Sequence, residues 1–199
     1  TDNNNCAQTA TVVVANGAAI ATPTAGSNSP VCANGTLNLT AANVAGATYS
    51  WTGPNGFTSL SQNPSITGVT TAASGTYTVT ATVGGCTNTS TVNVTINPNP
   101  TVTVPANITR CAGTTVAASA YTSTPAGATY TWTNSNTAIG LGASGTGNQP
   151  SFTATNATGA AISGIISVTP TVGGCTGTPS TYTITVNPTP TVTVPANIA

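Results

Sequence analysis

Five cysteines are the residues of this sequence best suited to covalent chemistry, and they stand at positions 6, 32, 86, 111 and 175. A cysteine thiol serves as a nucleophile, a metal ligand or one half of a disulfide. A zinc site is disfavoured, because no two cysteines have the CxxC spacing and the chain contains no histidine. Disulfides and buried free thiols both stay open at this point.

Charged side chains are almost absent from the 199 residues, which include one basic residue, Arg110, and one acidic residue, Asp2. General acid–base catalysis needs a titratable group near the working pH, and Ca²⁺ or Mg²⁺ sites need several carboxylates. Nucleic-acid binding needs a basic surface that displaces counterions. The composition therefore predicts that the chain is not an enzyme, holds no cofactor or metal ion, and binds no nucleic acid.

Apolar residues make up 38% of the chain, which is enough to form packed cores. A membrane-spanning helix needs about 20 consecutive apolar residues. The nearest run, residues 10–21, is interrupted by Asn16 and Gly17. We therefore expect no membrane span in this segment.

The sequence repeats itself with a period of about 80–90 residues, the size of one small β-sandwich. Each repeat has a cysteine, a tryptophan, the phrase Val-Gly-Gly-Cys-Thr and an Asn-Pro-x-Pro segment, in that order. These landmarks are Cys32, Trp51, Cys86 and residues 97–100 in the first repeat, and Cys111, Trp132, Cys175 and residues 187–190 in the second.

Two repeats are complete, at residues 22–98 and 99–188. The segment that begins at Cys6 resembles the one that begins at Cys86, so residues 1–21 are interpreted as the last strand of a preceding module. Residues 100–108 return unchanged at 190–198, so residues 189–199 are interpreted as the first strand of a following module. The Asn-Pro-x-Pro segments are interpreted as short, stiff linkers, since proline cannot continue a central strand.

Alternation of apolar and polar residues, as in residues 76–83 and 181–186, predicts half-buried strands throughout. Gly84-Gly85 and Gly173-Gly174 separate alternating runs and predict hairpin turns. The fold class expected is all-β, with tandem sandwiches in a rod-like array. The expected core includes Trp51, Trp132, Tyr77 and Tyr182, and a ligand-stacking role for the tryptophans is the alternative.

The repeat implies that Cys32 pairs with Cys86 and that Cys111 pairs with Cys175. Each bond would join the start of an early strand to the start of the last strand. Cys6 is left over, and its partner is expected in another module or another chain. Disulfides persist outside the reducing cytosol, which predicts an extracellular or cell-surface location.

Several motifs resemble the PKD-like and Ig-like repeats of very large bacterial surface proteins, including gliding-motility adhesins exported by the type IX route. The second repeat resembles the PKD-like type, and the first resembles the Ig-like type found beside it. The resemblance rests on residues 110–113 (RCAG), 130–134 (YTWTN), 144–147 (SGTG), 173–179 (GGCTGTP) and 183–188 (TITVNP), and on residues 30–32 (PVC), 49–57 (YSWTGPNGF) and 75–79 (GTYTV). It implies immunoglobulin-like sandwiches and an adhesive or structural role.

Three functions are compatible with these observations. The first is a stalk or filament segment of a secreted or cell-surface bacterial adhesin, which presents an adhesive tip or forms a surface fibre. The second is a subunit of a self-assembling extracellular filament joined by strand exchange. The third is a carbohydrate-binding module. Expected partners are further copies of the same repeat, in one chain or in a fibre, and a surface polysaccharide is a further candidate.

Overall fold

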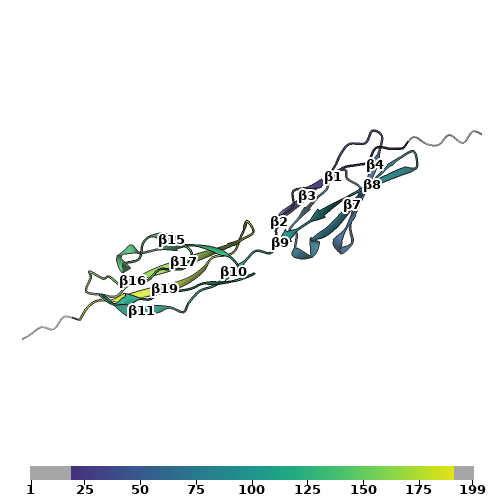
Figure 1. Cartoon of the computed structure of the whole chain (residues 1–199). Coiled ribbons are helices and arrows are strands. Elements are labelled where there is room, and N and C mark those ends of the chain that lie inside the picture. The colour runs from purple at the N-terminus through teal and green to yellow at the C-terminus, as the bar shows by residue number, and fades with distance from the viewer. Residues whose placement is uncertain (1–18, 191–199) are drawn as a thin grey trace, which may run out of the picture. The chain divides into compact units, whose positions relative to one another are not determined.

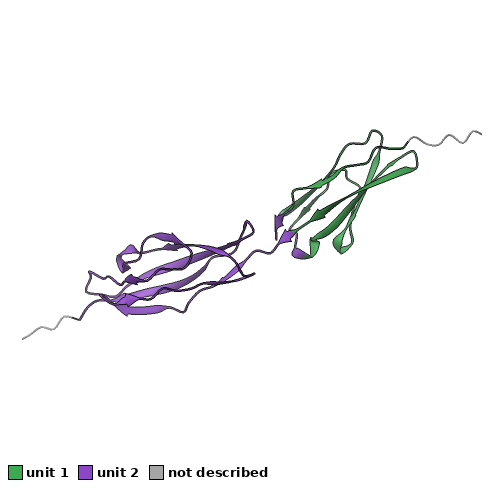
Figure 2. Ribbon diagram, in the orientation of Figure 1, with its two compact units in different colours: residues 1–29, 36–67, 72–95 green, residues 30–35, 68–71, 96–199 purple. Residues whose placement is uncertain are grey.

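The structure, a computed structural model, describes residues 19–190 (Figure 1). These residues form β-strands, turns and three short 3-10 helices, so the all-β prediction is confirmed. They divide into two compact units, coloured separately in Figure 2. Among the described residues, unit 1 comprises residues 19–29, 36–67 and 72–95, and unit 2 comprises residues 30–35, 68–71 and 96–190. Two loops of the first repeat, residues 30–35 and 68–71, therefore belong to unit 2.

Unit 1 is built from two antiparallel sheets with strand orders β1-β3-β6 and β5-β4-β7-β8. The strands are β1 (Ala25–Ser27), β3 (Thr36–Ala41), β4 (Thr48–Gly53), β5 (Phe57–Ser59), β6 (Ser65–Thr67), β7 (Gly75–Val83) and β8 (Cys86–Val94), and the 3-10 helices η1 (Pro54–Gly56) and η2 (Thr71–Ala73) lie between them in the chain.

The alternation in the sequence sets the two faces of these sheets. In β3 the threonine and asparagine side chains are exposed, whereas Leu37 and Leu39 are buried. In β7 the buried positions are Tyr77, Val79 and Ala81, again two residues apart. Successive strand residues point to opposite faces, so each sheet presents one apolar face to the core and one hydroxyl-rich face to solvent.

Unit 2 contains a larger sheet with the order β11-β19-β17-β14-β15 and three two-stranded pairs, β2-β9, β10-β13 and β12-β16. Its strands are β2 (Val31–Cys32), β9 (Ile96–Asn97), β10 (Thr101–Thr103), β11 (Ile108–Cys111), β12 (Thr115–Val116), β13 (Thr122–Thr124), β14 (Thr129–Asn134), β15 (Ser144–Thr146), β16 (Phe152–Thr153), β17 (Ile162–Val172), β18 (Cys175–Thr176) and β19 (Ser180–Asn187), with the 3-10 helix η3 (Thr137–Ile139) after β14.

The strand β17 runs the length of the large sheet and sets its register. Its first residue, Ile162, pairs with Val186 of β19, and its last residue, Val172, pairs with Cys175 of β18. The strand β11 lies on the other side of β19 and runs parallel to it. The core of unit 2 is apolar and includes Trp132, Ile166 and Val168.

Candidate functional site

The disulfide of the structure joins Cys32 to Cys175, with an S–S distance of 2.05 Å and a Cα–Cα distance of 5.5 Å. Cys86 and Cys111 are exposed free thiols. The predicted pairs Cys32–Cys86 and Cys111–Cys175 are therefore wrong. The bond lies within unit 2 and joins a residue of the first repeat to a residue of the second. Cys6 lies outside the described residues.

The register of the large sheet explains why Cys111 does not pair with Cys175. Cys111 faces Asn187 at one end of β19, next to the start of β17, whereas Cys175 faces Val172 at the other end of β17. The 11 residues of β17 separate these ends by about 30 Å, since a strand rises about 3.3 Å per residue. A disulfide requires Cα atoms within about 7 Å. The two cysteines of one repeat therefore occupy opposite ends of it.

Cys32 lies in a small loop, residues 30–35. We use the name cap for this loop together with β9 and the 68–71 loop, to which it is hydrogen-bonded. The strand β2 pairs in parallel with β9, so that Cys32 lies opposite Asn97. Ala33 N donates to Asn97 O at 2.8 Å, and Gly35 N donates to Cys32 O at 3.0 Å. Asn34 has a φ of 67°, a left-handed conformation that asparagine tolerates well. The backbone thus fixes the direction in which the Cys32 side chain leaves the cap.

Cys175 follows the turn Gly173-Gly174, in a tight hairpin between β17 and β18. Both glycines have positive φ, 56° and 79°, as hairpin turns of the I′ type require. The predicted Gly-Gly turns at 173–174 and 84–85 are confirmed, since Val83 likewise pairs with Cys86 across the second of them. Cys175 is 1% exposed, so the half of the disulfide that the hairpin contributes is buried.

The Asn-Pro-x-Pro segment begins at the last residue of β9 and forms hydrogen bonds with residues near both cysteines of this disulfide. Asn97 Nδ2 donates to Gly173 O at 3.4 Å, and Asn99 Nδ2 donates to Ala33 O at 3.0 Å. A side chain at Gly177 would clash with the Pro100 carbonyl oxygen, so glycine is needed where the hairpin passes the entering chain. The predicted linker is therefore held by side-chain amides as well as by its prolines.

The two tryptophans, which sequence reasoning placed in the core, are buried. Trp51 is 1% exposed and its Nε1 donates to Gln62 O at 3.1 Å. Trp132 is 4% exposed and its ring covers Gly145 of the neighbouring strand, where a side chain would clash. Its Nε1 is buried without a partner. Neither indole ring is exposed enough to stack against a ligand from solvent.

Tyr77 and Tyr182 are buried as well, and each hydroxyl has a partner. Tyr77 Oη donates to Ala73 O at 2.9 Å. Tyr182 Oη donates to Gln149 Oε1 at 2.9 Å and lies 3.1 Å from Tyr121 Oη. Burial raises the pKa of all three tyrosine hydroxyls, most strongly that of Tyr121, where the bond to Tyr182 adds to the effect. Sequence reasoning missed this network, because Gln149 belongs to no alternating run.

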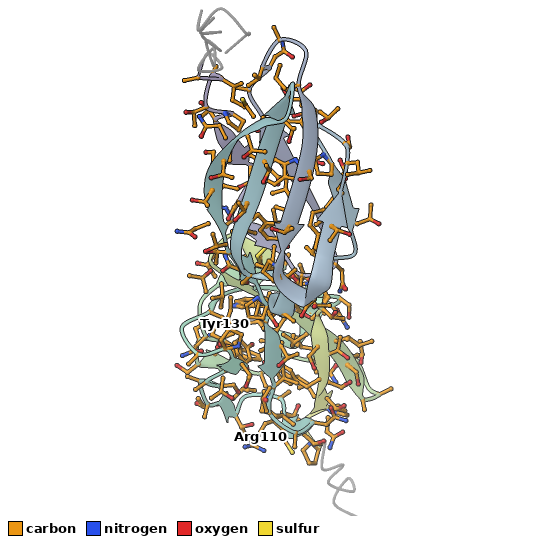
Figure 3. All side chains as sticks on the ribbon, turned by 90° about the vertical axis from the view of Figure 1, so that its right-hand side faces the viewer. Arg110 and Tyr130 are labelled. Carbon is orange, nitrogen blue, oxygen red and sulfur yellow. A yellow bond between two sulfur atoms is a disulfide. The ribbon has the colours of Figure 1, made fainter. Side chains whose placement is uncertain are left out.

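A shallow hollow of about 550 Å³ lies on the surface of unit 2. It is lined by Tyr130, by threonines of β14 and β15 and by Asn148. Figure 3 labels Tyr130 and, at the other end of the unit, Arg110 of β11. The Arg110 Nη1 donates to Thr109 O at 2.8 Å, so the lone cation of the chain bonds to its own strand.

Within residues 19–190 no three residues among histidine, cysteine, aspartate and glutamate come together as a metal site. In the same part of the chain, no helix is long and apolar enough to cross a membrane. The chemistry that the described residues do support is the formation and exchange of disulfides.

Similar folds occur in solved structures of tandem immunoglobulin domains. The titin I-band fragment I67–I69 matches with a TM-score of 0.50 and 10% identity over 84% of this chain and 63% of that one. The DIP-gamma IG1+IG2 structure matches with a TM-score of 0.43 and 11% identity, covering 85% and 95% of the two chains. The Hoc capsid protein of bacteriophage RB49 matches with a TM-score of 0.43 and 16% identity, covering 84% and 59%. No curated protein matches the sequence significantly.

Two family models match the chain in succession. The model described as "Ig-like domain CHU_C associated" matches residues 21–100. The model described as "PKD-like domain" matches residues 108–190. Both matches agree with the resemblance drawn from the motifs and with the all-β fold of the two units. The chain therefore carries a CHU_C-associated Ig-like domain over residues 21–100, followed by a PKD-like domain over residues 108–190.

Proposed function

We propose that this chain is a structural segment of a secreted or cell-surface bacterial adhesin, in which it forms part of a stalk or filament. The observation that carries the proposal is the Cys32–Cys175 disulfide. Its two sulfur atoms come from the Ig-like and the PKD-like domain, so the bond ties successive domains of one chain to each other. A cross-link of this kind suits a protein that transmits load along a series of domains.

The remaining composition supports a structural role outside the cytosol. Only 1% of the residues are charged, so acid–base chemistry has few groups to work with. A disulfide of this kind persists in oxidising surroundings and is rare in the cytosol. We further propose that the domains, at residues 22–98 and 99–188, belong to a longer series in which residues 1–21 and 189–199 contribute strands to the neighbouring modules.

Surface labelling of the cells that produce the protein tests this proposal. Intact cells are treated with a protease that cannot enter them, needs no reducing agent and does not cleave at lysine. The released peptides are then mapped without reduction. The expected result is release of peptides from this chain with Cys32 bonded to Cys175. Recovery of the chain only after cell lysis, with Cys32 and Cys175 as free thiols, would overturn both the location and the structural role.

A carbohydrate-binding function is the second candidate, and the hollow beside Tyr130 favours it. An aromatic ring flanked by threonine hydroxyls and the Asn148 amide offers the mixture of apolar and polar groups that a sugar needs. Isothermal titration with surface polysaccharide should then show binding that is lost in Tyr130→Ala. The matched control is Leu60→Ala, which removes an exposed apolar side chain of unit 1. Equal binding by both variants would exclude the hollow.

A further inference from the structure

Cys111 lies in a cap that repeats the hydrogen bonds of the Cys32 cap. The strand β11 pairs in parallel with β19 and places Cys111 opposite Asn187, as β2 and β9 place Cys32 opposite Asn97. Ala112 N donates to Asn187 O at 2.9 Å, which corresponds to the bond from Ala33 to Asn97. The thiol of Cys111 therefore leaves an equivalent backbone in an equivalent direction.

The loops around the two caps correspond as well. Gly113 N donates to Ala154 O at 2.8 Å, and Asn34 N donates to Val69 O at 2.7 Å. Both turn residues have positive φ, 84° at Gly113 and 67° at Asn34. Both domains of this chain therefore contain a cap with the same backbone structure, although the two caps differ in sequence.

Cys86 lies in a hairpin that repeats the hairpin of Cys175. Gly84 and Gly85 have φ values of 56° and 84°, close to the 56° and 79° of Gly173 and Gly174. Cys86 pairs with Val83 as Cys175 pairs with Val172. Cys86 therefore belongs to the hairpin half of the linkage, and Cys111 belongs to the cap half.

The chain that enters each domain passes beside this hairpin. In unit 1 Asn88 Nδ2, two residues after Cys86, donates to Ile20 O at 3.2 Å. In unit 2 Gly177, two residues after Cys175, packs against Pro100. In a series of domains, the chain from the preceding domain therefore enters beside the hairpin. A disulfide of the Cys32–Cys175 kind requires the cap of the preceding domain to lie at this hairpin.

The two free thiols differ from their bonded equivalents in exposure. Cys175 is 1% exposed, whereas Cys86 is an exposed residue of the same hairpin type. Cys111 is exposed, whereas its equivalent Cys32 is half-buried. Each of these two free cysteines has the same local backbone as one cysteine of the Cys32–Cys175 disulfide. Within the described residues, neither has a second cysteine bonded to it.

We propose that Cys111 of one copy of this chain forms a disulfide with Cys86 of a second copy, repeating the Cys32–Cys175 linkage between copies. The proposal rests on the structural role proposed above and names its partner, a second copy of this chain. Bond formation removes one proton and one electron from each thiol. The two electrons pass to a low-molecular-weight disulfide, such as oxidised glutathione, which leaves as two thiols.

The same equivalence predicts the contacts around the new bond. Asn187 corresponds to Asn97, so its side-chain amide is expected to donate to the Gly84 carbonyl of the second copy. Thr189 stands where Asn99 stands in the first linker, and it lacks the amide that reaches Ala33. The joint between copies therefore keeps one of the two amide contacts that accompany the joint within a copy.

Two complementary variants of the full chain test the proposal. Both carry Cys6→Ser, and one adds Cys86→Ser while the other adds Cys111→Ser. Each is incubated with oxidised glutathione alone and in an equal mixture, and products are separated without reduction. The expected result is a covalent dimer in the mixture that is lost in each variant alone, and a ladder of longer products from Cys6→Ser itself.

Peptide mapping of the dimer must find Cys86 bonded to Cys111. Absence of a dimer in the mixture, or equal dimer in each variant alone, would overturn the proposal, because the thiols would then be merely exposed. Both substituted side chains are exposed, and circular dichroism checks that the variants fold. The surface-labelling test of the proposed function relies on Cys32–Cys175 alone, so either proposal can fail without the other.

Discussion

A pulling force applied to the two ends of this chain should pass through the Cys32–Cys175 bond, because that bond is the shortest covalent path between them. The 143 positions that it spans cannot lengthen while the bond is intact. Only the residues before Cys32 and after Cys175 can then extend. Reduction of the bond releases the rest of the chain to the force.

The size of this effect follows from the sequence separation. An extended residue adds at most about 3.5 Å, so 143 positions hold about 500 Å of hidden length. The oxidised chain has 55 residues outside the loop and should reach about 190 Å at full extension. The reduced chain should reach about 690 Å.

Single-molecule force spectroscopy with peptide-tag handles at both ends measures these lengths. Free thiols are first blocked by alkylation, and the Cys32→Ser variant without reductant serves as the control for the reduced chain. Equal lengths with and without reductant would refute the bond. A hidden length of about 410 Å would instead indicate the pairs Cys32–Cys86 and Cys111–Cys175, which enclose 54 and 64 positions.

The remaining predictions concern the disulfide, the core and the tyrosine network. Trypsin cuts this chain only after Arg110, so the two halves should stay together on a non-reducing gel after digestion of the denatured, oxidised protein, and separate with reductant; separation without reductant would contradict the linkage. Trp51→Ala and Trp132→Ala should each lower the free energy of unfolding by about 3–5 kcal/mol through cavity formation, measured by urea denaturation; unchanged stability with lost ligand binding would indicate a binding surface. Because burial raises the pKa of Tyr182 and Tyr121 in the folded state, their contribution to stability is complete below pH 10 and is lost as the pH rises further. Thermal melts between pH 8 and pH 12 should show this fall, and Tyr182→Phe should reduce it; an unchanged fall in that variant would exclude the network as its cause. Stability should change little between about 50 mM and about 500 mM salt, because the chain has almost no charges to screen; a large shift in the melting temperature would contradict this.

The strands, hairpins and buried aromatic residues followed from the sequence because they depend on neighbours along the chain. Alternation of two residues places Tyr77 and Val79 on one face whatever the rest of the sheet does, and Gly84-Gly85 fixes its turn through backbone conformation alone. These features are local, and period and turn chemistry are enough to predict them.

The disulfide partners depended on a non-local feature that the sequence pattern does not contain. The Gly-Gly turn identifies the end of the domain at which Cys175 lies. The end at which Cys111 lies is decided by the parallel pairing of β11 with β19, in which Cys111 meets Asn187. If β11 paired with β19 in the antiparallel direction, Cys111 would lie at a different position along the sheet. Nothing in the four residues of β11 distinguishes parallel from antiparallel pairing.

The placement of the cap and the hairpin at opposite ends of each domain gives any series of copies a direction. A bond between a cap and a hairpin is a heterologous contact, which uses two different surfaces and leaves both unused ones available for the next copy. A dimer with two-fold symmetry would instead consume the same surface twice and stop. The two ends of a growing series would therefore be chemically different, one presenting the thiol of Cys86 and the other that of Cys111. Capping either thiol alone would halt growth at one end and leave the other end active.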